Sequence, residues 1–148
     1  MKFTPDNITE LGKNQIFTFG SNESGIHGAG AALLAKEKFG AKYGVGFGLQ
    51  GQSFAIPSKN WSIQALDLEV INFYVSRFIA FAKARPDFEF LITRIGCGLA
   101  NLGPKDIAPM FRSAINLPNC VLPRDFCSVL GMDRANRWCG DSDYPYTD

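Results

Sequence analysis

The chain has 148 residues, of which 46% are hydrophobic, and its 15 basic and 14 acidic side chains give a formal net charge of +1. This length and composition predict a single globular domain with its own core and exclude an intrinsically disordered chain. The balanced charge argues against nucleic acid and membrane surfaces as partners, but it allows a local phosphate site, because backbone N–H groups bind anions without basic side chains.

Targeting and metal-binding patterns are absent from the sequence. No apolar run approaches the roughly 20 residues of a membrane span, and the N-terminal segment is too polar for a signal peptide, so we expect a cytoplasmic protein. The four cysteines, Cys97, Cys120, Cys127 and Cys139, form no C-x-x-C, and one histidine cannot complete the usual zinc patterns. We therefore expect free thiols, no metal and no resident cofactor.

The first half of the chain predicts a strand, a loop and a helix. The strand covers residues 15–19, the polar loop reads ESGIHGAG, and the helix covers about residues 29–39. The glycine-rich segment that follows predicts a flexible loop. Within it, residues 46–51 read GFGLQG and match the dinucleotide pattern G-x-G-x-x-G, but that pattern needs a strand before it and a helix after it, and here a strand follows.

Strands and helices alternate along the rest of the chain. Apolar residues at helical spacing predict a long helix over about residues 68–84. Short apolar runs and proline positions predict the other elements, which are strands at residues 53–57, 88–95 and 119–123 and a helix at about 104–115 that Pro109 should kink or shorten. This alternation is typical of a layered α/β fold.

Two glycine-bearing turns each follow a predicted strand and precede a predicted helix. In the first, Asn22 comes just after the strand, and Gly28-Ala29-Gly30 opens the helix. In the second, Gly96-Cys97-Gly98-Leu99 precedes Pro104. Glycines let a ligand approach the backbone closely, and a helix N-terminus offers unpaired N–H groups. Because ligands of open α/β sheets bind at the carboxyl ends of strands, the pair of turns indicates a site that grips a diphosphate from both sides.

The sequences HGAGAALLAKEKFG and RIGCGLANLGPKDIAP resemble the macrodomain family, and in particular the branch that contains the terminal ADP-ribose protein glycohydrolase. The likeness covers about residues 14–125. It implies a three-layer α/β/α sandwich with a central mixed sheet and a cleft for ADP-ribose or a related nucleotide. It also implies that two groups of residues bind this ligand, namely Asn22, Gly28, Ala29 and Gly30 along the distal ribose and diphosphate, and Gly96, Cys97, Gly98 and Leu99 as the second phosphate loop.

The same branch uses a lysine as nucleophile on the ribose and an aspartate just after its GCGL motif. Lys59, in the sequence IPSK, falls where that lysine would be. Ala100 and Asn101 follow GCGL, so the carboxylate and its roughly 10²–10⁴-fold general acid–base assistance are missing. The resemblance therefore implies nucleotide binding but leaves hydrolysis open. Lys59 has three interpretations: the catalytic residue, a phosphate contact or an exposed loop lysine.

Three more side chains each have two interpretations. His27 borders the first glycine turn and either contacts the ligand or is an ordinary packed or solvated histidine. Phe126 either stacks on an adenine, as the resemblance implies, or belongs to the core. Cys97 with His27 suggests a thiol nucleophile, but no third residue is supplied to orient the histidine, so a small loop residue explains Cys97 better.

Together these observations predict a protein that binds ADP-ribose or a related nucleotide. If it is an enzyme, it hydrolyses an ADP-ribose ester or derivative as a glycohydrolase or deacylase. The alternative is a non-catalytic module that sequesters a nucleotide, or that contacts a protein partner or a second copy of itself. The domain core is expected at about residues 14–130, and residues 131–148 form an extension whose role the sequence does not indicate.

Overall fold

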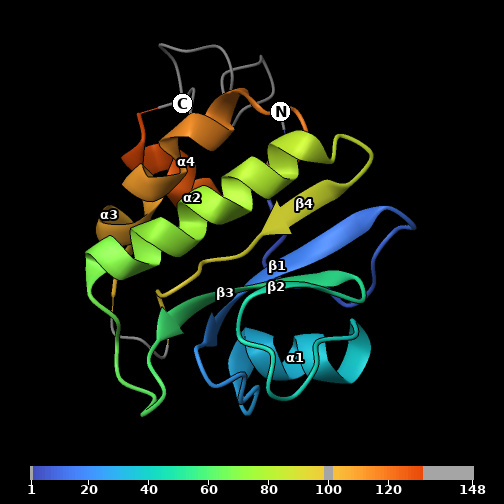
Figure 1. The fold of residues 1–148 in the computed structure, drawn as a ribbon. Coiled ribbons are helices and arrows are strands. Elements are labelled where there is room, and N and C mark those ends of the chain that lie inside the picture. The colour runs from blue at the N-terminus through green and yellow to red at the C-terminus, as the bar shows by residue number, and fades with distance from the viewer. Residues whose placement is uncertain (1, 99–101, 132–148) are drawn as a thin grey trace.

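The structure is a computed structural model that describes residues 2–98 and 102–131. Within these residues, five strands form one mixed sheet in the order β2-β3-β1-β4-β5 (Figure 1). The strands are β1 (Gln15–Asn22), β2 (Gly48–Gln50), β3 (Ser53–Lys59), β4 (Glu89–Ile92) and β5 (Cys120–Val121). β1 pairs in parallel with β3 and β4, β5 pairs in parallel with β4, and β2 is antiparallel to β3. This arrangement confirms the mixed α/β class.

Helices cover both faces of the sheet, as Figure 1 shows. α1 (Gly30–Lys38) lies against one face and contacts β1. The other face carries the remaining helices, which are α2 (Leu68–Ala84), α3 (Pro104–Ile107), the 3-10 helix η1 (Ala108–Asn116) and α4 (Arg124–Val129). No helix among the described residues is both long and apolar enough to cross a bilayer.

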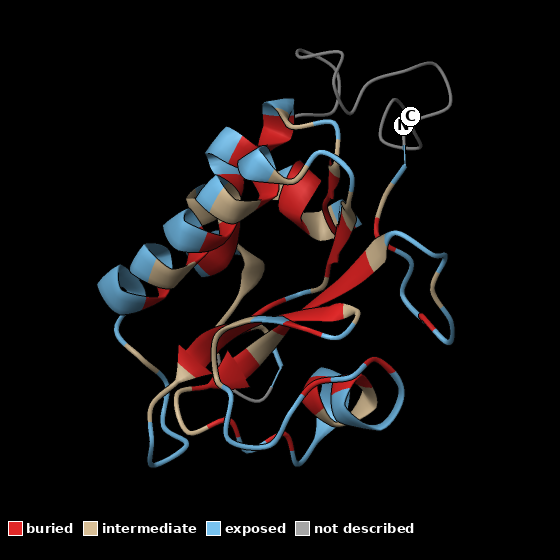
Figure 2. Ribbon diagram, turned by 45° about the vertical axis from the view of Figure 1, so that its right-hand side comes forward, coloured by how far each residue is buried: buried red, intermediate tan, exposed pale blue. Residues whose placement is uncertain are grey.

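The central strands are apolar along most of their length because both of their faces are covered. In β1, Ile16 packs on the α2 side, whereas Phe17 and Phe19 pack on the α1 side. β3 alternates in the same way, with Phe54 on the α2 side and Ala55 on the α1 side. Figure 2 shows the result, with buried strands between helices that are buried toward the sheet and exposed outside.

The larger of the two cores lies between the sheet and α2. The apolar face of α2 that the spacing predicted is buried there, and Phe78 is its largest member. The Phe78 ring lies edge-on to the rings of Phe54 and Phe90, with centroids 5.0 and 5.2 Å away. Such aromatic pairs each add about 0.5–1.5 kcal/mol beyond the burial of their area. The long helix is thus fixed across the sheet.

Three elements differ from the sequence expectations. The helix predicted over residues 104–115 is one turn of α-helix followed by the 3-10 helix η1, and the change comes next to Pro109, which has no N–H to continue the α-helical ladder. β2 and α4 were not predicted. The predictions for the C-terminal extension and for residues 99–101 concern residues that are not described, apart from Gly131.

Candidate functional site

A cleft of about 630 Å³ opens at the carboxyl ends of the parallel strands β1, β3 and β4. Its wall consists mainly of the end of β1, the start of α1, the end of β3 and the turn after β4. The described lining residues are 20–22, 26, 28–32, 58–59, 63, 93–96 and 98. Open α/β sheets bind small molecules at this place, in cavities of roughly 300–1,000 Å³.

The first glycine loop, residues 22–30, is held from within by the side chain of Asn22. The carboxamide Oδ1 accepts hydrogen bonds from the Ile26 N–H and the Ser24 hydroxyl, both at 2.8 Å, and Nδ2 donates to the Ile26 carbonyl at 2.7 Å. Asn22 also lines the cleft, as the sequence predicted. Because both ends of its carboxamide are engaged within the loop, Asn22 shapes the loop and keeps one Nδ2 N–H for a ligand.

A brace segment, residues 42–47, packs against the first glycine loop so closely that a glycine is required on each side of the contact. A Cβ at Gly25 would lie 2.3 Å from the Val45 nitrogen, and a Cβ at Gly46 would lie 2.4 Å from the Asn22 carbonyl oxygen. The Cβ of a real side chain does not come this near to backbone atoms. The segment is therefore a backbone support for the cleft, rather than the flexible loop that its glycines predicted.

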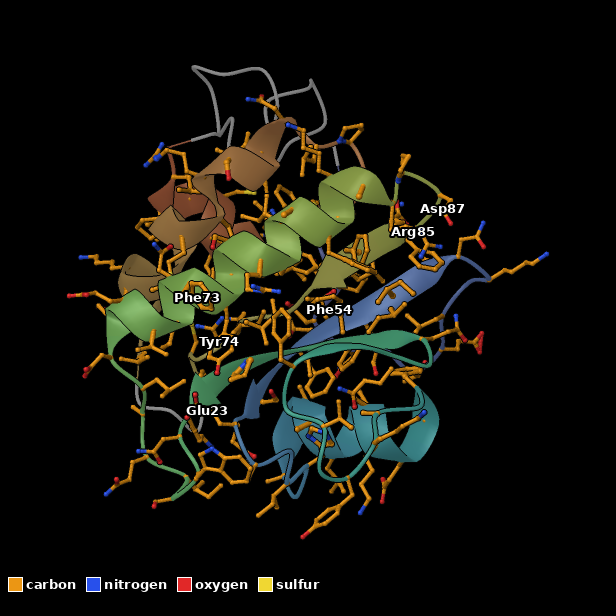
Figure 3. All side chains as sticks on the ribbon, viewed as in Figure 1. Glu23, Phe54, Phe73, Tyr74, Arg85 and Asp87 are labelled. Atoms are coloured by element: carbon orange, nitrogen blue, oxygen red, sulfur yellow. The ribbon has the colours of Figure 1, made fainter. Side chains whose placement is uncertain are left out.

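The first glycine loop is also tied to α2. The Tyr74 hydroxyl on α2 donates to Glu23 Oε2 at 2.7 Å, and Figure 3 shows the two side chains meeting beside the end of β1. The Glu23 N–H donates to the Lys59 carbonyl at 2.9 Å. These bonds link the loop to the helix layer and to β3, in addition to its packing against the brace segment.

His27 is buried, with 1% of its surface exposed, and its side chain is not among the groups that line the cleft. Its Nε2 lies 3.0 Å from the Lys42 carbonyl oxygen, and its ring packs edge-on against Phe19 at 5.4 Å between centroids. The buried Nδ1 finds no hydrogen-bond partner among the described residues. The structure therefore corrects the first interpretation of His27: it is a packed histidine beneath the loop and not a ligand contact.

The start of α1 supplies anion-binding groups. Ala29 is the N-cap in an extended conformation, and no side chain caps the first turn. The N–H groups of the first turn of α1 have no acceptor within the helix, and residues 28–32 line the cleft. Unpaired N–H groups and the positive end of the helix dipole together favour a negatively charged ligand here. Gly28, Ala29 and Gly30 thus line the cleft, and their contact with a ligand stays a prediction.

The second glycine loop begins at Gly96, which follows β4 and residues 93–95. Gly96 has a φ of +78°, a conformation that strains any other residue, and a Cβ there would lie 3.2 Å from Ile107 Cδ1. At Gly98 a Cβ would meet no atom of the described residues within 4 Å. Both glycines line the cleft, facing the start of α1 as expected. Leu99 and Ala100 lie outside the described residues.

Cys97 lies between these glycines, but its side chain turns toward the core. It packs against the larger hydrophobic cluster, does not line the cleft, and its Sγ lies 3.6 Å from the Ile95 carbonyl oxygen. Burial raises the pKa of the Cys97 thiol, against an opposing effect of Arg94. A thiol with a raised pKa is a weaker nucleophile near neutral pH, which agrees with the interpretation of Cys97 as a small loop residue.

Lys59 ends β3 and reaches the cleft beside Asn22, its register partner on β1. Partial burial lowers the pKa of Lys59 below its ordinary value. Lys59 and Arg94 are the basic residues of the described lining, which contains no aspartate or glutamate. The cleft thus combines backbone N–H groups with two basic side chains, one of which is more easily deprotonated than a free lysine.

Phe126 does not take part in the cleft. It is fully buried on α4, and its ring lies 5.8 Å from that of Phe111 in the core. The adenine-stacking interpretation of Phe126 is therefore replaced by its alternative, a core residue.

A second cavity of about 310 Å³, which the sequence did not indicate, adjoins the cleft and shares Gly30, Ala31, Thr93 and Arg94 with it. Its wall includes the N-terminal residues 4–8, together with Phe17, Leu34 and Pro123.

Arg94 stands at the junction of the two cavities and is the main residue that sequence reasoning missed. Its Nε donates to Asp125 Oδ2 on α4 at 2.6 Å, which leaves its terminal nitrogens for other partners. The available signal was a basic residue directly between an apolar strand and a glycine turn. Asp6 was also missed, because nothing local in the sequence places the N-terminal segment beside the cleft.

The groups that line this site are suited to an anion. In the parts of the chain that the structure describes, no three His, Cys, Asp or Glu side chains come together as a metal-ligand group. The donors present are backbone N–H groups, an amine and a guanidinium, which recognise phosphate and carboxylate oxygens. Comparison of the chain with models of protein families, with curated proteins and with solved structures gives no match.

Proposed function

We propose that the chain is a macrodomain-like α/β/α sandwich that binds ADP-ribose or a related nucleotide in the cleft. The observation that carries the proposal is the pair of glycine loops at the ends of the neighbouring strands β1 and β4, which line one cavity from two sides. A diphosphate between the first turn of α1 and the Gly96 loop would meet unpaired N–H groups from α1 and a backbone bared by glycine.

The charges of the cleft support a ligand with a central anion. Lys59 and Arg94 are the charged residues of the described lining, and they come from opposite ends of it, one at the end of β3 and one after β4. The anion would lie between them, at the start of α1. A dianionic diphosphate suits this arrangement better than a neutral sugar or a cation.

The second cavity supports a ligand with two ends. Its wall combines apolar side chains such as Ile8 and Leu34 with the polar side chains of Asp6 and Asn7. A flat heterocycle needs both, because its faces are apolar and its edges form hydrogen bonds. We assign the base of the nucleotide to this cavity and the distal ribose to the region of Asn22 and Lys59.

The binding proposal is tested by calorimetry with ADP-ribose, NAD, AMP and ribose 5-phosphate. We expect the tightest binding for ADP-ribose, because it spans both cavities and carries a diphosphate. Equal affinity for AMP and ADP-ribose would contradict the placement of the diphosphate, and absence of binding at millimolar concentration of every ligand would overturn the proposal.

Hydrolysis of an ADP-ribose ester or derivative is the second candidate, and the lowered pKa of Lys59 favours it. The uncharged Lys59 amine would attack the anomeric carbon of the distal ribose, and the bond to the leaving group would break with its electron pair. Water would then release the ribose from the lysine. Absence of a carboxylate directly after GCGL makes us expect slow turnover.

This activity is tested by product release from an ADP-ribosylated carboxylate ester, with the wild type and with Lys59→Ala. The control is Lys38→Ala, which removes an exposed lysine of α1 that does not line the cleft. We expect turnover in the wild type and the control and its loss in Lys59→Ala. Equal turnover in all three proteins would remove Lys59 from the mechanism.

A further inference from the structure

Ile63 has a backbone conformation that is unfavourable for a residue with a branched side chain. Its φ is +62°, and it is the one non-glycine residue with positive φ among residues 2–98 and 102–131. This region is uncommon for any side chain and a genuine outlier for a β-branched one, and glycine or asparagine adopts it with less strain. Strain of this kind gathers at functional sites, where the surrounding structure imposes it.

The turn that carries Ile63 imposes this conformation through its own hydrogen bonds. The Asn60 Oδ1 accepts from the Ser62 and Gln64 N–H groups at 2.8 and 3.0 Å, and the Asn60 N–H donates to the Gln64 carbonyl at 2.8 Å. The Ile63 N–H donates to the Asn60 carbonyl at 3.0 Å. The turn therefore fixes the direction in which the Ile63 side chain leaves the backbone.

That side chain lines the cleft, and a second isoleucine does so from the neighbouring loop. Ile26 lies in the first glycine loop, and the Asn22 carboxamide holds both its N–H and its carbonyl. Ile63 and Ile26 are 44% and 42% exposed, so neither side chain is used to fill the core. Their loops leave the paired ends of β3 and β1, where Lys59 is the register partner of Asn22.

We infer that Ile63 and Ile26 form an apolar subsite beside Lys59 that selects ligands whose distal ribose carries an uncharged aromatic or apolar substituent. This inference rests on the proposed function, because it concerns the end of the same nucleotide. A charged substituent would lose water against the two isoleucine side chains, and only one that extends past them to Lys59 would gain a partner, whereas an apolar one is favoured by the contact itself. The retained strain at residue 63 is explained by the side chain that it places there.

The inference is tested by calorimetry with three probes, which are ADP-ribose, its phenyl glycoside at the distal ribose and ADP-ribose 1″-phosphate. The proteins are the wild type, Ile63→Asn, Ile26→Ala and the control Leu49→Ala, which removes an equally exposed side chain of β2 away from the cleft. We expect the wild type and the control to bind the phenyl glycoside roughly tenfold more tightly than the phosphate. We expect Ile63→Asn and Ile26→Ala to lose most of this preference.

The outcomes separate this inference from the proposed function. Wild-type protein that binds ADP-ribose but shows no preference for the phenyl glycoside overturns the subsite alone, whereas a wild type that binds none of the three probes overturns both. Thermal unfolding adds a readout for a purely structural role. Ile63→Asn should unfold at a temperature no lower than the wild type, since asparagine tolerates positive φ. If both variants keep the full preference of the wild type, the isoleucines do not select the ligand.

Discussion

The first glycine loop and the second differ in what their glycines do. In the first, Gly25 meets the brace segment backbone to backbone, as Gly46 of the brace does from the other side, and a side chain at either place would collide with main-chain atoms. In the second, Gly96 is required by its positive φ, and the nearest side chain to it is that of Ile107. The first glycine loop is held by close packing against the brace segment, and the second is shaped by its own backbone conformation.

The comparison also separates glycines that the fold needs from glycines that it does not. Among residues 2–98 and 102–131, a Cβ at Gly28 would have its nearest neighbour at 3.9 Å, and one at Gly98 would have none within 4 Å. Both residues line the cleft. Among the described residues no neighbour requires glycine at these two positions, and under the proposed function their small size would let a ligand approach the backbone closely.

The largest effect that tests this comparison is expected for Gly46→Ala. The new methyl group would meet the Asn22 carbonyl, and we expect the free energy of unfolding to fall by about 3 kcal/mol, as for severe overpacking. Urea denaturation measures it. The control Gly28→Ala, in the first glycine loop, should change stability by less than about 0.5 kcal/mol. Equal losses in the two variants would mean that the brace does not support the loop.

The second loop is tested by Gly96→Ala and Gly98→Ala. We expect Gly96→Ala to lose about 1–2 kcal/mol because alanine is strained at positive φ. Gly98→Ala should stay within about 0.5 kcal/mol of the wild type in stability. It should nevertheless bind ADP-ribose roughly tenfold more weakly in calorimetry, because its methyl group occupies the space beside the phosphates. Unchanged binding by Gly98→Ala would remove this loop from the ligand site.

A smaller effect is expected from the bond that ties the first loop to α2. Burial and the Glu23 carboxylate raise the pKa of Tyr74 to about 12, above the roughly 10 of an unfolded chain. A raised pKa stabilises the fold fully below pH 10, and this contribution is lost as the pH rises toward 12. Denaturation between pH 9 and 11.5 should therefore show a decline that Tyr74→Phe reduces.

The matched control for this titration is Tyr43→Phe, since Tyr43 is 71% exposed. It should leave the pH dependence of the wild type unchanged. A decline of equal steepness in Tyr74→Phe and the wild type would show that the loop is not held through this hydroxyl.

The smallest effect is expected for Cys97→Ser. Because the thiol packs away from the cleft, ADP-ribose binding should stay within about twofold and stability within about 1 kcal/mol. The raised pKa also predicts slow modification by a thiol reagent at pH 7.5, compared with a free cysteine. Rapid labelling that abolishes binding would instead place the thiol in the site.

Features with a local signal were predictable from the sequence. The buried face of α2 follows from apolar spacing, and the cleft position follows from the rule that strand ends carry the ligand in open sheets. Pro109 marks the change from α3 to η1 because its ring nitrogen carries no hydrogen to continue the α-helical ladder. Asn22, Lys59 and the glycines at 28, 30, 96 and 98 therefore came together as expected.

What the sequence did not reveal depends on contacts between distant residues. β2 has three residues, one of them glycine, which is too short for an alternating pattern. The burial of His27 is set by the brace segment, and that of Phe126 by its packing on Phe111. Ile63 looks like an ordinary loop residue until its backbone angle is known.

The arrangement of the sheet edges has a consequence for aggregation. β2 spans three residues and β5 two, so both outer strands of the described sheet are short. At β5, the Thr4 N–H and hydroxyl donate to the Leu122 and Val121 carbonyls, so the N-terminal segment covers part of that border. Long bare edges recruit strands from other molecules, and this sheet limits such recruitment at both sides. The two short edges thus offer few free backbone groups to a strand of another molecule.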